Sequence, residues 1–97
     1  MPQWGELWDK SLRQCFVEAA LLALDDAKVD QVDTLAVGAM SSGIFVEQEH
    51  LASMMADYIG MAGIPATRVE SACASGALAV RTAALEILSG QAKIALA

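Results

Sequence analysis

Residues 67–77 are the most informative part of the sequence and read Thr67-Arg68-Val69-Glu70-Ser71-Ala72-Cys73-Ala74-Ser75-Gly76-Ala77. Their pattern predicts a brief strand over residues 67–70. It also predicts a helix over residues 73–88 that is apolar on nearly every side, and such a helix is expected to be buried on every side. Ser89 and Gly90 then end this helix, because glycine commonly follows the last helical residue.

The chain before this stretch alternates helices with short apolar runs. Ser11 and Gln14 have the spacing of a capping box, and apolar residues at helical spacing follow them, which predicts an amphipathic helix over residues 11–27. Residues 34–40 form a short apolar run and predict a buried strand. The serines and glycine of residues 41–43 predict a turn after it.

Two further elements complete the predicted order. An apolar stripe predicts a second helix over residues 46–59, and residues 94–97 begin a last strand. The resulting order α-β-α-β-α-β favours parallel strands joined by crossover helices. The predicted fold class is therefore α/β.

The composition indicates more apolar surface than the chain can bury alone. Of its 97 residues 56% are hydrophobic and 19% are charged, against the usual shares of about 45–50% and about 25%. A domain of this size removes only about 60–65% of its unfolded surface from water. We expect its faces to pack against the rest of a longer polypeptide or against a partner subunit.

Charge and hydropathy argue against several classes of partner. Twelve acidic and six basic residues give a net charge of −6, and the basic residues are scattered, so no nucleic-acid partner is expected. No apolar stretch reaches the roughly 20 residues that cross a bilayer, and the amino terminus lacks the order of a signal peptide. We therefore expect a soluble, cytoplasmic protein with no membrane partner.

The two cysteines suggest neither a disulfide framework nor a metal site. Cys15 and Cys73 are too few for a secreted scaffold, and no CxxC pair is present to bind zinc. Cys15 lies inside the first predicted helix, where a packing role is expected. A reducing compartment and no bound metal are the expectations.

Cys73 occupies the junction between a predicted strand and a predicted helix. Free amide groups and the positive end of the helix dipole lie at such a junction, and both favour the thiolate that attacks an acyl carbonyl. The small residues Ala74, Ser75 and Gly76 would let a thioester approach the sulfur, and their amides are candidate donors to an oxyanion. Position alone also fits a cysteine that only packs.

The residues around Cys73 resemble the nucleophile segment of thiolases, in the run Val69-Glu70-Ser71-Ala72-Cys73-Ala74-Ser75-Gly76 followed by a helix of small residues. Upstream, residues 16–27 and Val37-Gly38 resemble the first helix and second strand of that family. Residues 48–66 are most similar to the archaeal and bacterial acetyl-CoA acetyltransferase branch, which is related to the sterol-carrier-type thiolases. The resemblance covers nearly the whole chain.

This resemblance implies a fold and a reaction. The fold has five layers, αβαβα, in two similar halves, with the helix after Cys73 as one of two central helices. In the implied reaction an acyl-CoA acylates Cys73, and a second acyl-CoA attacks as a carbanion to give a 3-ketoacyl-CoA; the reverse reaction cleaves such a compound with coenzyme A. Coenzyme A thioesters are then substrates, and no permanently bound cofactor is expected. A homo-oligomer, with a possible small accessory protein, is the expected assembly.

Residues 1–97 would then be the amino-terminal part of the first thiolase-like domain, truncated at both ends. The family's first strand is replaced by Met1-Pro2-Gln3. The histidine that activates the cysteine, and a second acid/base group, belong to the carboxy-terminal half in that family. Lys28 stands where a glycine is common, which costs about 0.5–1 kcal/mol if the position is left-handed.

Other side chains and other functions stay open at this point. His50, the only histidine, follows Glu47 and Glu49, and we expect it to be solvated rather than to act as a base or metal ligand. Arg68 is expected to neutralise Glu70. A ketosynthase-like condensing enzyme acting on carrier-protein thioesters is one alternative function, and a non-catalytic binding or assembly subunit is another.

Overall fold

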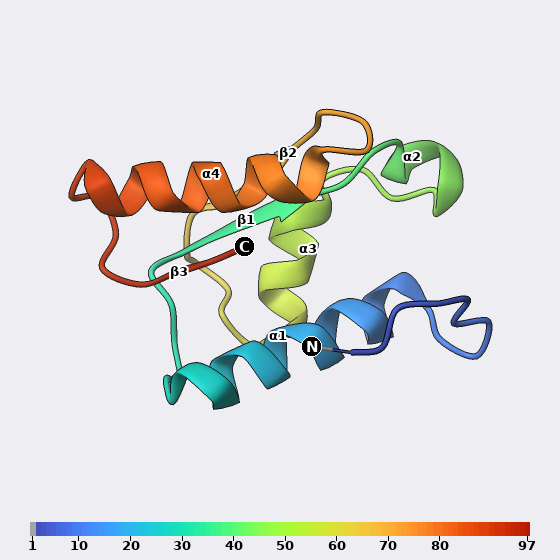
Figure 1. Ribbon diagram of the computed structural model, residues 1–97, viewed down its shortest axis with the longest axis horizontal. Helices are drawn as coiled ribbons and strands as arrows, with labels where there is room; N and C mark the ends of the chain where they lie inside the picture. The colour runs from blue at the N-terminus through green and yellow to red at the C-terminus, as the bar shows by residue number, and fades with distance from the viewer. Residues whose placement is uncertain (1) are drawn as a thin grey trace.

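The computed structural model describes residues 2–97. Met1, the first residue of the segment that replaces the family's first strand, lies outside the described residues. Within this range α4 covers one face of a small sheet, and α3 and α1 lie on the other side (Figure 1). The elements are α1 Leu12–Ala27, β1 Thr34–Gly38, α2 Ser42–Phe45, α3 Leu51–Tyr58, β2 Ala66–Val69, α4 Ser75–Leu88 and β3 Ala95–Leu96.

The first helix confirms its predicted capping box. Ser11 Oγ accepts the N–H of Gln14 at 3.1 Å, and Gln14 Oε1 accepts the N–H of Ser11 at 2.7 Å. The helix ends at Ala27, and its cap residue Lys28 has a φ of 56° and a ψ of 43°. Lys28 therefore occupies the left-handed position in which the sequence suggested a cost relative to glycine.

The sheet is parallel throughout and has the strand order β2-β1-β3. Leu35 pairs with Ala66 in β2 and with Leu96 in β3, so β1 is the central strand. The carboxylate of Asp33 fastens the start of β3 to β1, because its Oδ2 accepts the N–H groups of Lys93 and Ile94 at 2.8 and 3.0 Å. These bonds to Ile94 and Lys93 lower the pKa of Asp33. The prediction of parallel strands and an α/β class is confirmed.

Successive residues of β1 face opposite layers, as the pleat of a strand requires. Leu35 packs in one cluster with Leu51 and Met55 of α3, whereas Ala36 packs in another with Ala79 and Ala83 of α4. The second cluster consists of alanines. Its small side chains let α4 lie close to β1, and this brings the beginning of α4 to the carboxyl end of the sheet.

Gly38 allows the closest contact between these two elements. A Cβ atom at Gly38 would lie 2.1 Å from the carbonyl oxygen of Ser75 and 2.8 Å from the nitrogen of Gly76. Real Cβ atoms essentially never approach within 3.0 Å of a neighbour. The glycine at the end of β1 is therefore required for the position of the first turn of α4.

The segment between β1 and β2 differs from the prediction. The predicted helix over residues 46–59 begins only at Leu51, and the turn predicted over residues 41–43 leads into the short helix α2. Ser41, Glu47 and His50 have φ values of 55°, 53° and 53°. A right-handed helix cannot continue through left-handed residues, so the segment is divided at these positions.

The helix after Cys73 is buried on one side only within residues 2–97. Its inner residues Ser75, Ala79 and Ala83 are buried, but Val80 and Leu88 on other sides are 61% and 81% exposed. Within this range one small sheet covers only one face of the helix, and its other apolar faces are among those that the composition predicts to pack against the rest of a longer polypeptide or a partner subunit. No helix in this range has both the length and the apolar character needed to cross a membrane.

Candidate active site

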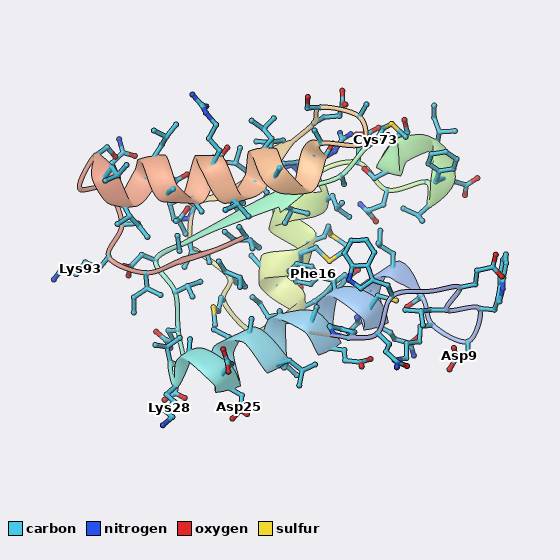
Figure 2. All side chains as sticks on the ribbon, in the orientation of Figure 1. Asp9, Phe16, Asp25, Lys28, Cys73 and Lys93 are labelled. Carbon is cyan, nitrogen blue, oxygen red and sulfur yellow. The ribbon has the colours of Figure 1, made fainter. Side chains whose placement is uncertain are left out.

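The carboxyl ends of β1 and β2 form one edge of the sheet, and Cys73 lies just beyond it. Gly38 pairs with Val69, and the N–H of Ala39 donates to the carbonyl of Val69 at 3.1 Å, so β1 and β2 end side by side at the same level of the sheet. Figure 2 shows Cys73 and Lys93 at opposite ends of α4. Ligands of open parallel sheets bind beyond the carboxyl ends of the strands, which is the region that Cys73 occupies.

A tight turn connects the end of β2 to α4. The N–H of Ala74 donates to the carbonyl of Ser71 at 2.8 Å, and the N–H of Ser75 donates to the carbonyl of Ala72 at 3.1 Å. Ala72 has a φ of 46° within this turn. Cys73 lies within this turn, immediately before Ala74, which is the N-cap residue of α4.

The thiol of Cys73 is free and exposed. Its exposure separates it from the alanine cluster under α4, so Cys73 does not pack in the core of residues 2–97. Cys15 is also free, but it is half-buried within α1. The structure therefore leaves the Cys73 sulfur accessible to a thioester.

The amide groups at the start of α4 fall into two sets. Those of Ala74 and Ser75 are engaged in the turn. Those of Gly76 and Ala77 make no hydrogen bond with an acceptor in the described part of the chain. The first N–H groups of a helix lack partners within the helix and point out of its amino-terminal end. Of the four amides from Ala74 to Ala77, those of Gly76 and Ala77 are thus the donors available to an oxyanion, and the N–H of Cys73 itself also makes no hydrogen bond in the described range.

The acidic and basic residues near this edge are arranged differently from the prediction. Arg68 does not neutralise Glu70: its Nη1 lies 3.6 Å from a carboxylate oxygen of Glu49, and its Nε donates to the carbonyl of Ala39 at 3.1 Å. Glu70 instead accepts the backbone N–H of Ala72. The ion pair between Arg68 and Glu49 connects the segment before α3 to β2. Glu70 makes its contact within the turn around Cys73 instead.

His50 is exposed and begins α3 without a capping hydrogen bond from its side chain. No hydrogen bond joins it to Cys73 among residues 2–97. In the same range, no group of three or more His, Cys, Asp or Glu residues is placed to hold a metal ion. Within residues 2–97 no titratable side chain makes a hydrogen bond with the Cys73 sulfur, and the carboxylate in the same turn, that of Glu70, is bonded to the N–H of Ala72.

Sequence reasoning missed two features of this site. The left-handed conformation of Ala72 has no signal in the sequence, because alanine rarely adopts it. The hydroxyl of Ser75 bonds to the turn, with Oγ 2.7 Å from the carbonyl oxygen of Ala72 and 2.9 Å from the nitrogen of Ser71. A serine two residues after the candidate nucleophile was the available signal for this contact.

Comparison with known proteins places these features in a family context. The family model described as "Thiolase, N-terminal domain" matches residues 3–97. An acetyl-CoA acetyltransferase of Methanocaldococcus jannaschii is 48% identical over 96 residues, which are 97% of this chain and 24% of that protein. An acetyl-CoA acetyltransferase of Methanothermobacter thermautotrophicus is 47% identical over 97 residues, which are 98% of this chain and 25% of that protein. The chain thus spans about a quarter of the length of these curated relatives.

Proposed function

The chain belongs to the thiolase family, and we propose that it forms the amino-terminal part of an acetyl-CoA C-acetyltransferase in which Cys73 is the nucleophile. The observation that carries the proposal is the exposed, free thiol of Cys73 at the turn before α4. It lies in a chain whose residues 3–97 match the amino-terminal domain of the family. The substrates are coenzyme A thioesters, and no permanently bound cofactor takes part.

The first half-reaction is acylation of Cys73. The thiolate attacks the carbonyl carbon of acetyl-CoA, the bond from that carbon to the coenzyme A sulfur breaks, and coenzyme A leaves as its thiolate and takes up a proton. Negative charge develops on the carbonyl oxygen during the attack. The unpaired N–H groups of Gly76 and Ala77 are suited to receive it. The product is a thioester on Cys73.

The second half-reaction forms or cleaves a carbon–carbon bond. A second acetyl-CoA loses an α-proton to a base, and its carbanion attacks the Cys73 thioester, which releases the thiolate and gives acetoacetyl-CoA. In reverse, coenzyme A cleaves acetoacetyl-CoA through the same thioester. The resemblance assigns the base and the histidine that activates the cysteine to the carboxy-terminal half, and within residues 2–97 the histidine present, His50, makes no hydrogen bond with Cys73.

The family match favours this reading over the two alternatives. A ketosynthase-like enzyme would use carrier-protein thioesters, whereas both relatives are named for acetyl-CoA. An assembly subunit would have no need of an exposed thiol at the carboxyl edge of the sheet. The named relatives and the accessible sulfur are the observations that separate the proposals.

The proposal includes a homo-oligomeric assembly, with room for a small accessory protein. Large apolar side chains lie exposed on several elements, among them Ile44 on α2 and Leu88 on α4. Exposed apolar surface of this kind is typical of faces covered by another part of a chain or by a subunit. Two free thiols fit the reducing environment of the cytoplasm, where acetyl-CoA condensation serves lipid metabolism.

The test uses the full-length enzyme and its Cys73→Ala variant. Acetoacetyl-CoA turnover is expected to fall by at least about 1000-fold, because the nucleophile is removed. Circular dichroism is expected to remain unchanged, since an alanine leaves little altered at an exposed position. Cys15→Ala is the matched control and should retain activity. Full turnover by Cys73→Ala would exclude Cys73 as the nucleophile.

A further inference from the structure

The residue before the candidate nucleophile has a strained backbone. Ala72 has a φ of 46°, which lies in the left-handed region that alanine seldom adopts. Residues in such conformations persist only where their surroundings hold them, and they are concentrated at functional sites. Because Ala72 adjoins Cys73, the groups that hold Ala72 also determine where the Cys73 sulfur lies.

Ser75 provides the first contact that holds this residue. Its Oγ donates to the carbonyl oxygen of Ala72 at 2.7 Å and accepts the N–H of Ser71 at 2.9 Å. A single hydroxyl therefore binds both ends of the Ser71–Ala72 segment. Ser75 is 4% exposed, so its hydroxyl is shielded from water at one end of each bond, although Ser71 and Ala72 are exposed.

Glu70 provides the second contact, from the exposed side of the turn. Its carboxylate accepts the backbone N–H of Ala72. A charged acceptor makes a stronger hydrogen bond than a neutral one. With Ser75 on its carbonyl and Glu70 on its amide, both backbone polar groups of Ala72 are bonded to side chains.

The bonds of Ser75 serve the turn rather than the helix that it begins. In α1, Ser11 illustrates the capping role of a serine, because its hydroxyl accepts the N–H of Gln14 inside the helix. The corresponding cap position of α4 is Ala74, which makes no side-chain bond. Ser75 directs its hydroxyl backward to Ser71 and Ala72 and leaves the helix uncapped. A serine that only stabilised α4 would be expected at the cap itself.

We propose that Ser75 is a positioning residue for acyl transfer: its hydroxyl, with Glu70 as the second contact, holds Ala72 left-handed and thereby fixes the Cys73 sulfur. This inference rests on the proposed function, because the position of the sulfur matters to the reaction only if Cys73 is the nucleophile. A displacement of a reacting group by about 1 Å is enough to slow a reaction by about 100-fold. Loss of the Ser75 contact should therefore lower the rate of the chemical step.

The experiment compares Ser75→Ala, Ser75→Thr and Thr82→Ala in the full-length enzyme. Ser75→Ala is expected to lower kcat for acetoacetyl-CoA thiolysis by at least about tenfold while KM stays within about twofold, because substrate binding is untouched. Ser75→Thr is expected to restore most of kcat, since a threonine hydroxyl also reaches a carbonyl three residues back. Thr82 is the matched control: its Oγ1 donates to the carbonyl of Leu78 at 2.9 Å in the same helix, away from the turn.

Each result bears on the proposal. An equal loss of kcat in Ser75→Ala and Thr82→Ala would overturn it, and so would a rise in KM with an unchanged kcat. If Ser75→Ala does not fold, Glu70→Ala is measured in its place, because Glu70 is exposed and its loss leaves the core intact. A fall in kcat of about threefold or more is then expected, and an unchanged kcat would overturn the proposal.

Failure of the positioning role and failure of the proposed function give different results. If Cys73→Ala is inactive and Ser75→Ala behaves like the parent, the reaction stands and only the role of Ser75 is rejected. If Cys73→Ala keeps full activity, the proposed function itself is rejected.

Discussion

Gly38→Ala is the substitution whose effect can be worked out most directly from the structure. The added Cβ would lie 2.1 Å from the carbonyl oxygen of Ser75 and 2.4 Å from its carbonyl carbon. Both atoms belong to the backbone, so no side-chain rotation relieves the contact. Restoring an ordinary separation requires β1 and the first turn of α4 to move apart by roughly 1 Å. We expect a loss of about 3 kcal/mol in the free energy of unfolding, at the upper end of the range for overpacked sites.

The same displacement is expected to reach the candidate nucleophile, because the turn that holds Cys73 is hydrogen-bonded to Ser75. In the full-length enzyme, acetyl transfer should fall by about 100-fold. Urea unfolding of the full-length enzyme measures the stability, and Gly76→Ala is its control. A Cβ at Gly76 meets no atom within 4 Å, so that variant should gain about 0.5 kcal/mol from helix propensity. A Gly38→Ala chain within about 0.5 kcal/mol of the parent would contradict the close contact of β1 and α4.

Three further outcomes are expected. Lys28→Gly should raise the free energy of unfolding in urea by about 0.5–1 kcal/mol, because glycine adopts the left-handed φ of this position without a steric cost; an unchanged midpoint would argue against it. The pKa of Asp33 is lowered by its bonds to the N–H groups of Ile94 and Lys93. The ionised carboxylate therefore stabilises the folded protein fully above the unfolded pKa of about 3.9, and this stabilisation is lost as the pH falls through the folded pKa. The stability difference between the parent and Asp33→Asn should therefore exist at pH 7 and disappear on acidification toward pH 2 or so, and a constant difference would contradict the assignment. The 97-residue chain alone should show no acetoacetyl-CoA turnover, because it spans about a quarter of its relatives' length and the resemblance assigns the base and the activating histidine to the carboxy-terminal half; measurable turnover would refute that account.

The elements with strong local signals were predictable from the sequence. The capping box of Ser11 and Gln14 marks the start of α1 by its chemistry, and the structure contains both bonds. The apolar run that became β1 and the helix after Cys73 were also found, because periodicity and glycine placement are local properties. Together they give the parallel α/β arrangement.

The features that the sequence did not predict depend on left-handed backbone conformations, which the residue types at those positions do not indicate. Ser41, Glu47 and His50 are left-handed in the structure and divide a segment whose apolar spacing favoured one long helix. Left-handed residues other than glycine or asparagine leave no clear mark in a sequence. The turn at Ala72 and its contact with Ser75 were missed for the same reason.

The exposed side of α4 illustrates a different limit. An apolar pattern on every side of a helix predicts burial, but it does not say whether the covering residues belong to the same stretch of chain. Val80 and Leu88 are exposed here because the sheet covers only the face that carries Ala79 and Ala83. The composition gave a better indication, since 56% hydrophobic residues in 97 exceed what a chain of this size can bury.

The central claim is that Cys73 carries the acyl group, and mass spectrometry of the full-length enzyme and of its proteolytic peptides after incubation with acetyl-CoA tests it most directly. A mass increase of about 42 Da, the mass of an acetyl group replacing a hydrogen, is expected on the peptide that contains Cys73, and hydroxylamine should remove it as it does other thioesters. The peptide containing Cys15 should remain unmodified, and prior alkylation of Cys73 with iodoacetamide should prevent the increase. An acetyl group on another residue, or the same mass increase in Cys73→Ala, would contradict the account.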